Sequence, residues 1–476
     1  MSSIQTAAKD IIPLTQKAAF GSGQLVLNLL PGALGFFMFF LLTAFGMDPF
    51  LAGLLGGLPR IFDAITDPIM GFISDNTTSK WGRRRPYIFI GAILSGVFFA
   101  LLWQLDENNS QLFNFWYFLI MSMVFLIGNT MFATPLVGLG YEMTTDYNER
   151  TRLMAFGNTM GQIAWMIVPW FWVIIADPDI FTSQAVGVRQ LSLIVGSLCM
   201  VLGILPAIFC KGIDSTHIEN RKEITWKTLF SNLIDLFKSM AEVFKNVPFL
   251  RLCGATFLVF NGFQMVASFS VFIIVFYLFN GSYGAAGTWP AWFSTVTAVL
   301  TAFVVIPIIS WIANQLGKRS AFIISTTISI IGYILKWWSF NPENPWLMFL
   351  PIPLIAFGLG GLFTLMMSMT ADVCDLDELN NGMPRKEGTF GAIYWWMVKL
   401  GQALALVLGG LVLKLVGFDQ NSVTQTMDTM TNLRIADIAI PSATAALAIL
   451  VMWKYDLSED RAREIKTELE NRRGEL

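Results

Sequence analysis

Residues 60–71 have the sequence Arg60-Ile-Phe-Asp-Ala-Ile-Thr-Asp-Pro-Ile-Met-Gly71 and lie within residues 51–74, an apolar segment long enough to cross a membrane. Two carboxylates, Asp63 and Asp67, stand one helical turn apart in this segment. A carboxylate at the centre of a membrane helix costs about 2.5 to 3.5 kcal/mol on insertion scales. Such a pair needs a cationic or solvated partner, and a bound cation is the first candidate.

The composition indicates a polytopic membrane protein. The 476 residues are 55% hydrophobic and 13% charged, whereas about a quarter of the residues in soluble domains are charged. The formal net charge is -2 and the basic residues form short clusters between apolar runs, so nucleic-acid binding is not expected. Four cysteines without paired spacing and a single histidine, His217, argue against a metal cluster or a catalytic triad.

Apolar runs of roughly 20 residues predict about twelve membrane helices. They lie near residues 20–46, 51–74, 87–104, 113–139, 152–176, 190–210, 250–280, 289–315, 319–339, 346–371, 389–416 and 436–454. Basic residues crowd the alternate loops, for example at Arg83, Arg84 and Arg85, and the positive-inside rule assigns these loops to the cytoplasm. With an even number of helices, both termini are expected to be cytoplasmic.

A long polar stretch divides the chain into two six-helix bundles. We predict an N-terminal bundle at residues 1–210, a cytoplasmic connector at 211–247, a C-terminal bundle at 248–456 and a cytoplasmic tail at 457–476. Residues 226–237 in the connector have an amphipathic pattern typical of an interfacial helix. Transporters built from repeated bundles bind substrate and ion near the midplane between the bundles.

The first candidate site is an oxygen-lined cation site. Asp63, Thr66 and Asp67 share one helical face because they are three and four residues apart. Carboxylate and hydroxyl oxygens suit a hard cation, and either carboxylate could instead carry a proton. The alternative for Asp67 is a structural role as a helix cap or as the partner of a basic loop residue.

Lys399 lies about eleven residues into the segment 389–416, too deep to reach either interface easily. It therefore needs a partner inside the protein, and Asp63 or Asp67 is the natural choice. A cation arriving at the aspartates would then compete with Lys399, which makes the pair a switch. The alternative is a fixed ion pair with no part in transport.

Further polar and aromatic side chains in the predicted helices are candidates for binding a polyhydroxylated substrate. They are Gln24, Asn28, Asn129, Thr134, Asn158, Gln162, Trp165, Asn261, Gln264, Phe363, Tyr394 and Trp395, with Thr130 beside Asn129. Each amide could equally bond a neighbouring helix, which is the commoner use of amides in membranes. Tryptophan near a helix end more often marks the membrane interface.

Three motifs resemble those of the glycoside-pentoside-hexuronide:cation symporters, the melibiose-permease branch of the major facilitator superfamily. The first joins residues 60–75 to Trp81-Gly-Arg-Arg-Arg-Pro86. The second is Tyr141-Glu-Met-Thr-Thr-Asp-Tyr-Asn-Glu-Arg-Thr-Arg152, and the third joins Ala371-Asp-Val-Cys-Asp-Leu-Asp-Glu-Leu379 to Arg385-Lys-Glu-Gly388. The resemblance implies an all-α fold of twelve transmembrane helices in two bundles, and import of a small solute by alternating access, driven by sodium or protons.

The resemblance also implies roles for individual residues. Asp63 and Asp67 match the family's cation-binding aspartates, Thr66 and Thr130 match positions beside them, and Lys399 matches its lysine on helix eleven. Asn28 falls near the sugar-binding aspartate of melibiose-type members. The basic loop Lys80 to Arg85, with Asp75, is expected to act as a cytoplasmic gate latch, and the predicted gate residues are Asp75, Arg83, Arg84, Glu142, Arg150 and Asp372.

Departures from the family pattern leave the substrate open. The melibiose-type aspartate on helix four falls at Ala133, the tryptophan there falls at Val137, and the arginine on helix five is replaced by Asn158. Galactoside specificity is therefore not carried over. The resemblance extends to lysolipid transporters, which keep the aspartate pair and the lysine but use an apolar cavity, and residues such as Phe36, Phe37 and Phe363 are compatible with that reading.

We therefore expect a secondary active symporter of the bacterial inner membrane that imports a sugar, glycoside or sugar acid with Na+ or H+. The alternative is a cation-coupled transporter of a lysolipid or another amphiphilic solute. No catalytic constellation assembles, so the protein is not expected to be an enzyme, and no cofactor is expected beyond the coupling ion. The expected partners are a small-molecule substrate and the lipid bilayer, with no nucleic acid, and the protein is expected to be a monomer.

Overall fold

The computed structural model describes residues 11–144, 147–211, 225–243, 245–381 and 387–457, together with 461–462, 464–465 and 467–469. Two compact units divide the chain, residues 1–233 and 234–476. Every regular element in the described residues is helical.

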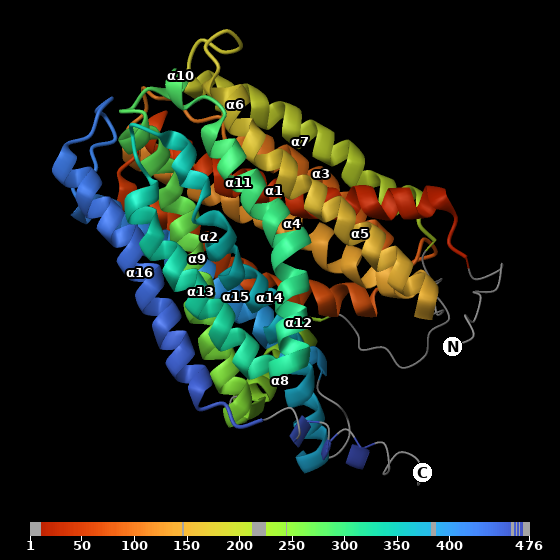
Figure 1. Ribbon diagram of the computed structural model, residues 1–476. Coiled ribbons are helices and arrows are strands. Elements are labelled where there is room, and N and C mark those ends of the chain that lie inside the picture. Colours follow the sequence, from red (N-terminus) through yellow and green to blue (C-terminus); the bar gives the residue numbers. More distant parts are fainter. Residues whose placement is uncertain are drawn as a thin grey trace. The chain divides into compact units, whose positions relative to one another are not determined.

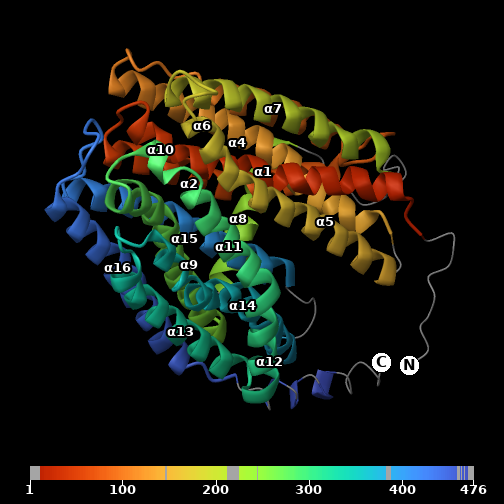
Figure 2. The same ribbon diagram turned by 45° about the horizontal axis from the view of Figure 1, so that its top comes forward.

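The first unit is built from long helices separated by short connections. Its elements are α1 (Leu14–Thr43), α2 (Pro49–Asn76), α3 (Arg85–Leu102), α4 (Gln111–Glu142), α5 (Tyr147–Ile167), η2 (Val168–Trp170), α6 (Phe171–Ala176) and α7 (Gln184–Phe209). Helix α3 packs between α4 and α7, and α1 packs on α5 and α7 (Figure 1). Figure 2 shows α1 and α5 side by side along most of their length.

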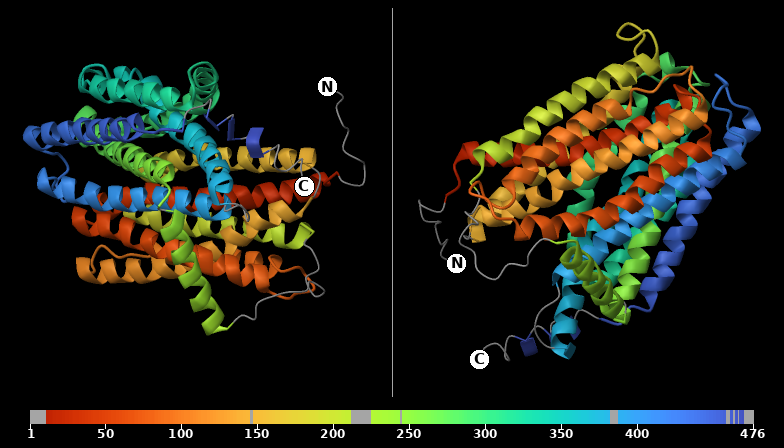
Figure 3. Two further views of the ribbon diagram at one scale, coloured as in Figure 1. Left: turned by 90° about the horizontal axis from the view of Figure 1, so that it is seen from below. Right: turned by 180° about the vertical axis from the view of Figure 1, so that it is seen from behind.

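The second unit follows the same plan with more interrupted helices. Its elements are α9 (Val247–Phe272), η3 (Ile273–Leu278), α10 (Tyr283–Ala286), α11 (Trp289–Leu300), η4 (Thr301–Val305), α12 (Ile306–Leu316), α13 (Lys318–Ser339), η5 (Pro345–Phe349), α14 (Ile352–Asn381), α15 (Glu387–Leu415) and α16 (Met427–Trp453). Helix α9 packs against α14, α15 and α16, and α16 also packs on α13. In Figure 3 the blue α16 runs beside the green α9.

Polar side chains just before the apolar segments cap the N-termini of α2 and α4. Asp48 caps α2 by accepting hydrogen bonds from the backbone N–H groups of Phe50 and Leu51, at 2.9 and 3.2 Å. Ser110 caps α4 in the same way through the N–H of Phe113. A side-chain oxygen at this position satisfies backbone donors that the first helical turn leaves unpaired. These caps fix where α2 and α4 start, and hence the register of the site that they carry.

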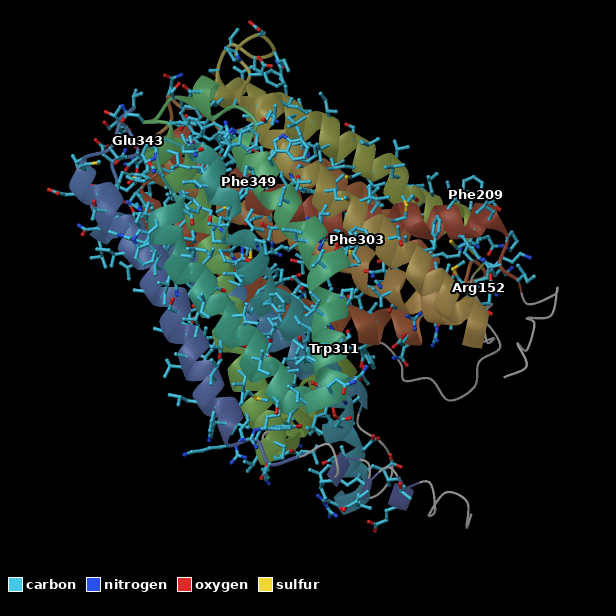
Figure 4. The ribbon with its side chains drawn as sticks, viewed as in Figure 1. Arg152, Phe209, Phe303, Trp311, Glu343 and Phe349 are labelled. Atoms are coloured by element: carbon cyan, nitrogen blue, oxygen red, sulfur yellow. The ribbon has the colours of Figure 1, made fainter. Side chains whose placement is uncertain are left out.

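Eleven helices in the described residues are long and apolar enough to cross a membrane. Helix α2 has 28 residues but is not among them; it carries Arg60, Asp63, Asp67 and Asp75. The exposed aromatic side chains of Phe303 and Trp311, labelled in Figure 4, lie on the η4–α12 stretch of such a helix. Exposed aromatic groups on apolar helices fit contact with lipid.

The two largest differences from the predicted helix boundaries are at the end of α14 and the start of α16. Helix α14 continues to Asn381, ten residues beyond the predicted segment, because a helix does not need apolar residues once it leaves the membrane. Helix α16 begins at Met427, not near residue 436, so Arg434 lies inside a helix and not in a loop. Aromatic rings cover its guanidinium, which offsets the penalty that apolarity-based prediction assigns to the charge.

Helix α8 (Trp226–Val243) occupies part of the predicted connector. Trp226, Phe230 and Ile234 are exposed and follow one another at four-residue intervals, so they form an apolar stripe along the helix. This stripe has the spacing expected of an interfacial helix.

Candidate functional site

Helices α2 and α4 bring the two predicted aspartates together around one hydroxyl group. The Oγ1 atom of Thr130 on α4 lies 3.0 Å from Oδ1 of Asp63 and 3.1 Å from Oδ1 of Asp67. Thr66 Oγ1 lies 3.3 Å from the same Thr130 oxygen and also donates to the backbone carbonyl of Asp63. All four residues predicted for the cation site therefore meet at one point, with Asp63 and Thr130 buried.

The cluster has more hydrogen-bond acceptor oxygens, on Asp63, Asp67 and Thr130, than hydroxyl protons to donate to them. Thr130 has one hydroxyl proton, so it can donate to one of the two carboxylates at a time while its lone pairs face the cluster. Carboxylate and hydroxyl oxygens at this spacing are suitable ligands for a hard cation or for a shared proton. Arg60, one turn earlier on α2, interacts electrostatically with Asp63 and was given no role by the sequence analysis.

Lys399, the predicted coupling residue, lies in the second unit on α15 and is half-buried. Its neighbour Val398 is buried in the apolar core of that unit.

A second group of predicted residues gathers between α1 and α5. Asn28 accepts a hydrogen bond of 3.2 Å from the indole Nε1 of Trp165 and donates one of 2.8 Å to the backbone carbonyl of Gln24. Gly161 on α5 makes this approach feasible, because a Cβ atom there would lie 2.7 Å from Nδ2 of Asn28. The contact fixes the orientation of both the Asn28 amide and the Trp165 ring.

The predicted residues of α5 share one exposed helical face. Asn158, Gln162 and Trp165 are separated by four and three residues, and all three side chains are exposed. On α4, Thr134 is half-buried, whereas Asn129 is buried and its Oδ1 has no hydrogen-bond partner among the described residues. An orphaned carbonyl oxygen one residue before Thr130 is a further acceptor beside the carboxylate pair.

The predicted substrate residues of the second unit separate into two kinds. Asn261 is buried and donates to the backbone carbonyl of Gly401, so it joins α9 to α15. Tyr394 is buried in the apolar core. Trp395 is 48% exposed and stacks on Phe363, with ring centroids 6.2 Å apart. Gln264 on α9 and Phe363 are half-buried. Among the predicted substrate residues of this unit, only Trp395 has a largely exposed ring.

Four of the predicted gate residues, Asp75, Arg83, Arg84 and Glu142, form one charged cluster in the first unit. Oε1 of Glu142, at the end of α4, accepts hydrogen bonds from Nε and Nη2 of Arg83 and, at 2.9 Å, from Nε of Arg84. Arg84 also pairs with Asp75 at the end of α2, at 2.9 Å. The cluster ties the ends of α2 and α4 to the start of α3.

The remaining two predicted gate residues are Arg150 and Asp372. The Arg150 side chain lies outside the described residues. Asp372 on α14 accepts a 2.6 Å hydrogen bond from Nζ of Lys318 within the second unit. This pair is a charged contact of the second unit alone.

Two of the ion pairs that the sequence analysis did not predict have a buried carboxylate. Glu149 at the start of α5 is buried and accepts hydrogen bonds from Lys17 and from the backbone N–H of Ile12. Burial alone would raise the pKa of Glu149, but these hydrogen bonds hold its pKa below the usual range. The second pair, Lys336 with Asp437, is fully buried. Charged residues within apolar segments were the available signal for this pair.

Comparison with known proteins identifies related sequences along nearly the whole chain. A family model described as MFS/sugar transport protein matches residues 19–459. The isoprimeverose transporter of Lactiplantibacillus pentosus is 22% identical, over 95% of this chain and 90% of its own. The glucuronide carrier protein homolog of Escherichia coli (strain K12) is 25% identical, over 90% of this chain and 89% of its own.

Other relatives have a different kind of named substrate. The sodium-dependent lysophosphatidylcholine symporter 1 of Gallus gallus is 23% identical, over 93% of this chain and 86% of its own. Among solved structures, that of a D-xylose-proton symporter has a TM-score of 0.59 at 15% identity and covers 93% of this chain and 97% of its own. A bacterial homolog of the human lysosomal transporter Spinster has a TM-score of 0.67 at 15% identity, over 93% of this chain and 98% of its own. These two structures share the fold.

Proposed function

The chain belongs to the MFS/sugar transport protein family, and we propose that it imports a sugar, glycoside or sugar acid together with Na+ or H+. Family membership makes it a multi-pass transporter of the inner membrane and not an enzyme. The proposal adds the substrate class, the coupling ion and the residues that bind them.

The proposed topology has twelve membrane helices with both termini in the cytoplasm. Helix α2 would be the twelfth span, with its charges turned to the protein interior. This placement puts Arg83, Arg84 and Lys318 on the cytoplasmic side, in agreement with the positive-inside rule. The Glu142 cluster and the Lys318–Asp372 pair would then be cytoplasmic gate contacts, one in each unit.

The observation that carries the proposal is the convergence of Asp63, Thr66, Asp67 and Thr130 on one point. Two carboxylates held this close repel each other, and a monovalent cation between them removes that repulsion. The site is therefore suited to Na+ or to a proton shared by the carboxylates. Asn129, with its orphaned oxygen, would be an additional ligand or a contact to the substrate.

The proposed substrate surface of the first unit is the face shared by α1 and α5. Exposed amides on a membrane helix are unfavourable against lipid, so Asn158 and Gln162 should face a water-filled passage. Trp165, with its ring fixed by Asn28, supplies a stacking face for a sugar ring on the same side of α5. Thr134 and Gln24 would complete the substrate contacts of the first unit. In the second unit the proposed substrate residues are Gln264, Phe363 and Trp395, whereas Asn261 and Tyr394 would support the helices of that unit.

A lysolipid or similar amphiphile is the second candidate substrate. It is favoured by the stacked, half-exposed Phe363–Trp395 pair and by the absence of a charged sugar anchor at Ala133 and Asn158. The relatives named as sodium-dependent lysophosphatidylcholine symporters also support this candidate. Both candidates use the same proposed cation site.

A ligand screen by thermal unfolding of the purified protein in detergent tests the proposal. A ligand that binds only the folded state raises the free energy of unfolding, by about 2.7 kcal/mol at a ligand concentration a hundredfold above its Kd. The melting temperature rises accordingly. We expect monosaccharides, glycosides or sugar acids to stabilise the protein, and Na+ or lower pH to increase that effect. Stabilisation by lysolipids alone would support the second candidate, and no response to either class would contradict both.

Lys399 is proposed as the residue that couples cation binding to transport. We expect Lys399→Ala to abolish concentrative uptake while solute exchange down a gradient persists, because the positive charge proposed to couple cation binding to transport is gone. Uptake and exchange in proteoliposomes measure this, and Lys414→Ala, a lysine near the end of the same helix, is the matched control. Concentrative uptake at the wild-type rate in Lys399→Ala would remove the coupling role.

A further inference from the structure

The second unit contains a buried ion pair that the proposed transport site does not use. Nζ of Lys336 on α13 contacts Oδ2 of Asp437 on α16, and both side chains are 2% exposed. Nζ of Lys336 also donates to Oγ of Ser270 on α9 at 3.3 Å and lies 5.0 Å from the centre of the Phe340 ring. The pair therefore joins α13 to α16, and Ser270 brings in α9.

Arg434 extends this cluster by one helical turn along α16. Its Nη1 donates to the hydroxyl of Tyr277 at 2.7 Å and its Nη2 donates to the backbone carbonyl of Trp337. The guanidinium carbon lies 4.2 Å from the centre of the Tyr277 ring and 4.5 Å from that of Trp337. Arg434 is thus held between two rings from different elements.

Tyr277 belongs to η3, a π-helix that follows directly on α9. Single π-helical turns are rare and occur frequently at functional sites, because they displace the following residues from the ordinary helical register. The chain then turns at Asn280 and Gly281, which both have positive φ. The cluster therefore holds the point at which α9 leaves regular helical geometry.

Stability alone is a weak reason to keep such a cluster. Replacing a buried ion pair by apolar residues of similar size is often neutral or stabilising, whereas removing one partner leaves an uncompensated charge. Lys336 lies in the last turn of α13, close enough to the helix end for its side chain to extend outward, yet it turns inward. A role in fixing the relative positions of helices accounts for this orientation.

The charges favour a fixed contact over a proton carrier. Lys336 and Arg434 place two cations around the single carboxylate of Asp437, and their attraction offsets part of the cost of burying its negative charge. Oδ1 of Asp437 has no hydrogen-bond partner in the part of the chain that the structure describes, while Oδ2 is held by Lys336. The ammonium and the guanidinium are each held by additional groups, so neither is poised to leave.

We propose that Lys336, Asp437 and Arg434 form a permanent clamp that positions the π-helical end of α9 against α13 and α16. The three residues are positioning residues for transport, and in the described residues their hydrogen bonds and ion pair are made to residues other than those proposed to bind cation or substrate. The ends of the three helices then move as one rigid piece when the protein changes conformation. This inference goes beyond the proposed function and does not depend on which substrate or ion is carried.

Charge-neutral replacement of the pair is the first test. We expect Lys336→Met and Asp437→Leu each to lower the melting temperature and the uptake rate, and the double variant to recover both to within about twofold of the wild-type uptake. Recovery is expected because the two apolar side chains fill the same space without a lone charge. A double variant that melts like the wild type but has lost concentrative uptake would assign the pair to ion transfer and overturn the clamp. Single variants with wild-type stability and uptake, or a double variant no better than the singles, would also overturn it.

The link to the π-helix is the second test. Arg434→Lys keeps the charge but loses the planar group that bonds Tyr277 and Trp337 together. We expect it to lower the maximal uptake rate at least threefold while the half-saturating concentrations of substrate and cation stay unchanged. Tyr277→Phe, which removes the hydroxyl but keeps the ring, should have a smaller effect in the same direction. Wild-type maximal rates in Arg434→Lys, or a change confined to half-saturation, would overturn the link; failure of any solute to be transported would instead reject the proposed function.

Discussion

Asp63→Asn should abolish cation-driven uptake while the protein still folds. The substitution keeps the size and one acceptor oxygen of the side chain but removes one of the two negative charges beside Thr130. Two unit charges 4 Å apart interact by about 4 kcal/mol at an effective dielectric constant of 20, so loss of one carboxylate should weaken cation binding by at least about tenfold. The measurement is solute uptake into proteoliposomes against Na+ concentration and against pH.

The same uptake measurement on variants of Thr130 distinguishes the contribution of the Thr130 hydroxyl from that of the Asp63 charge. Thr130→Val removes the central oxygen and should weaken cation activation, whereas Thr130→Ser should retain it. Ser122→Ala is the matched control, because Ser122 is buried on the same helix and its hydroxyl donates to the carbonyl of Leu119. An Asp63→Asn variant whose uptake keeps the wild-type dependence on both Na+ and pH would refute the cation site.

Glu142→Gln should cause the largest loss of stability among the gate variants. One carboxylate oxygen of Glu142 accepts from both Arg83 and Arg84, and the side chain is 9% exposed. Removing one partner of a buried ion pair costs about 3–5 kcal/mol, and the partial exposure of the two guanidinium groups reduces this to about 2–4 kcal/mol. Thermal unfolding of the purified variants measures the difference.

Two further variants test whether the effect comes from the cluster. Asp75→Asn alters a carboxylate that is 52% exposed and should cost less than about 1 kcal/mol. Gly138→Ala should displace Arg84, because a Cβ atom at this position would overlap the Nη1 atom of Arg84. Gly35→Ala is its control, since a Cβ atom there has no heavy atom within 4 Å. Equal melting temperatures for Glu142→Gln and Asp75→Asn would show that Glu142 is not the centre of the cluster.

The sequence by itself determined the helical, membrane-embedded character of this protein and its most informative residues. Apolar runs are a local property, so the spans of α1, α3 and α7 could be located to within about six residues at each end. The three- and four-residue spacing of Asp63, Thr66 and Asp67 is equally local, and it predicted their common face correctly. Apolarity did not locate the C-terminus of α14 or the N-terminus of α16, because polar residues continue both helices beyond their apolar segments.

Only the tertiary structure decided which distant residues meet. Thr130 reaches the aspartates because α2 and α4 pack together, and Lys336 meets Asp437 because α13 packs on α16. It also separated Asn261, which bonds α9 to α15, from Trp165, whose ring remains exposed, although both were equal candidates in the sequence. Periodicity places a side chain on a helical face, but the neighbour across that face follows from packing between helices far apart in the chain.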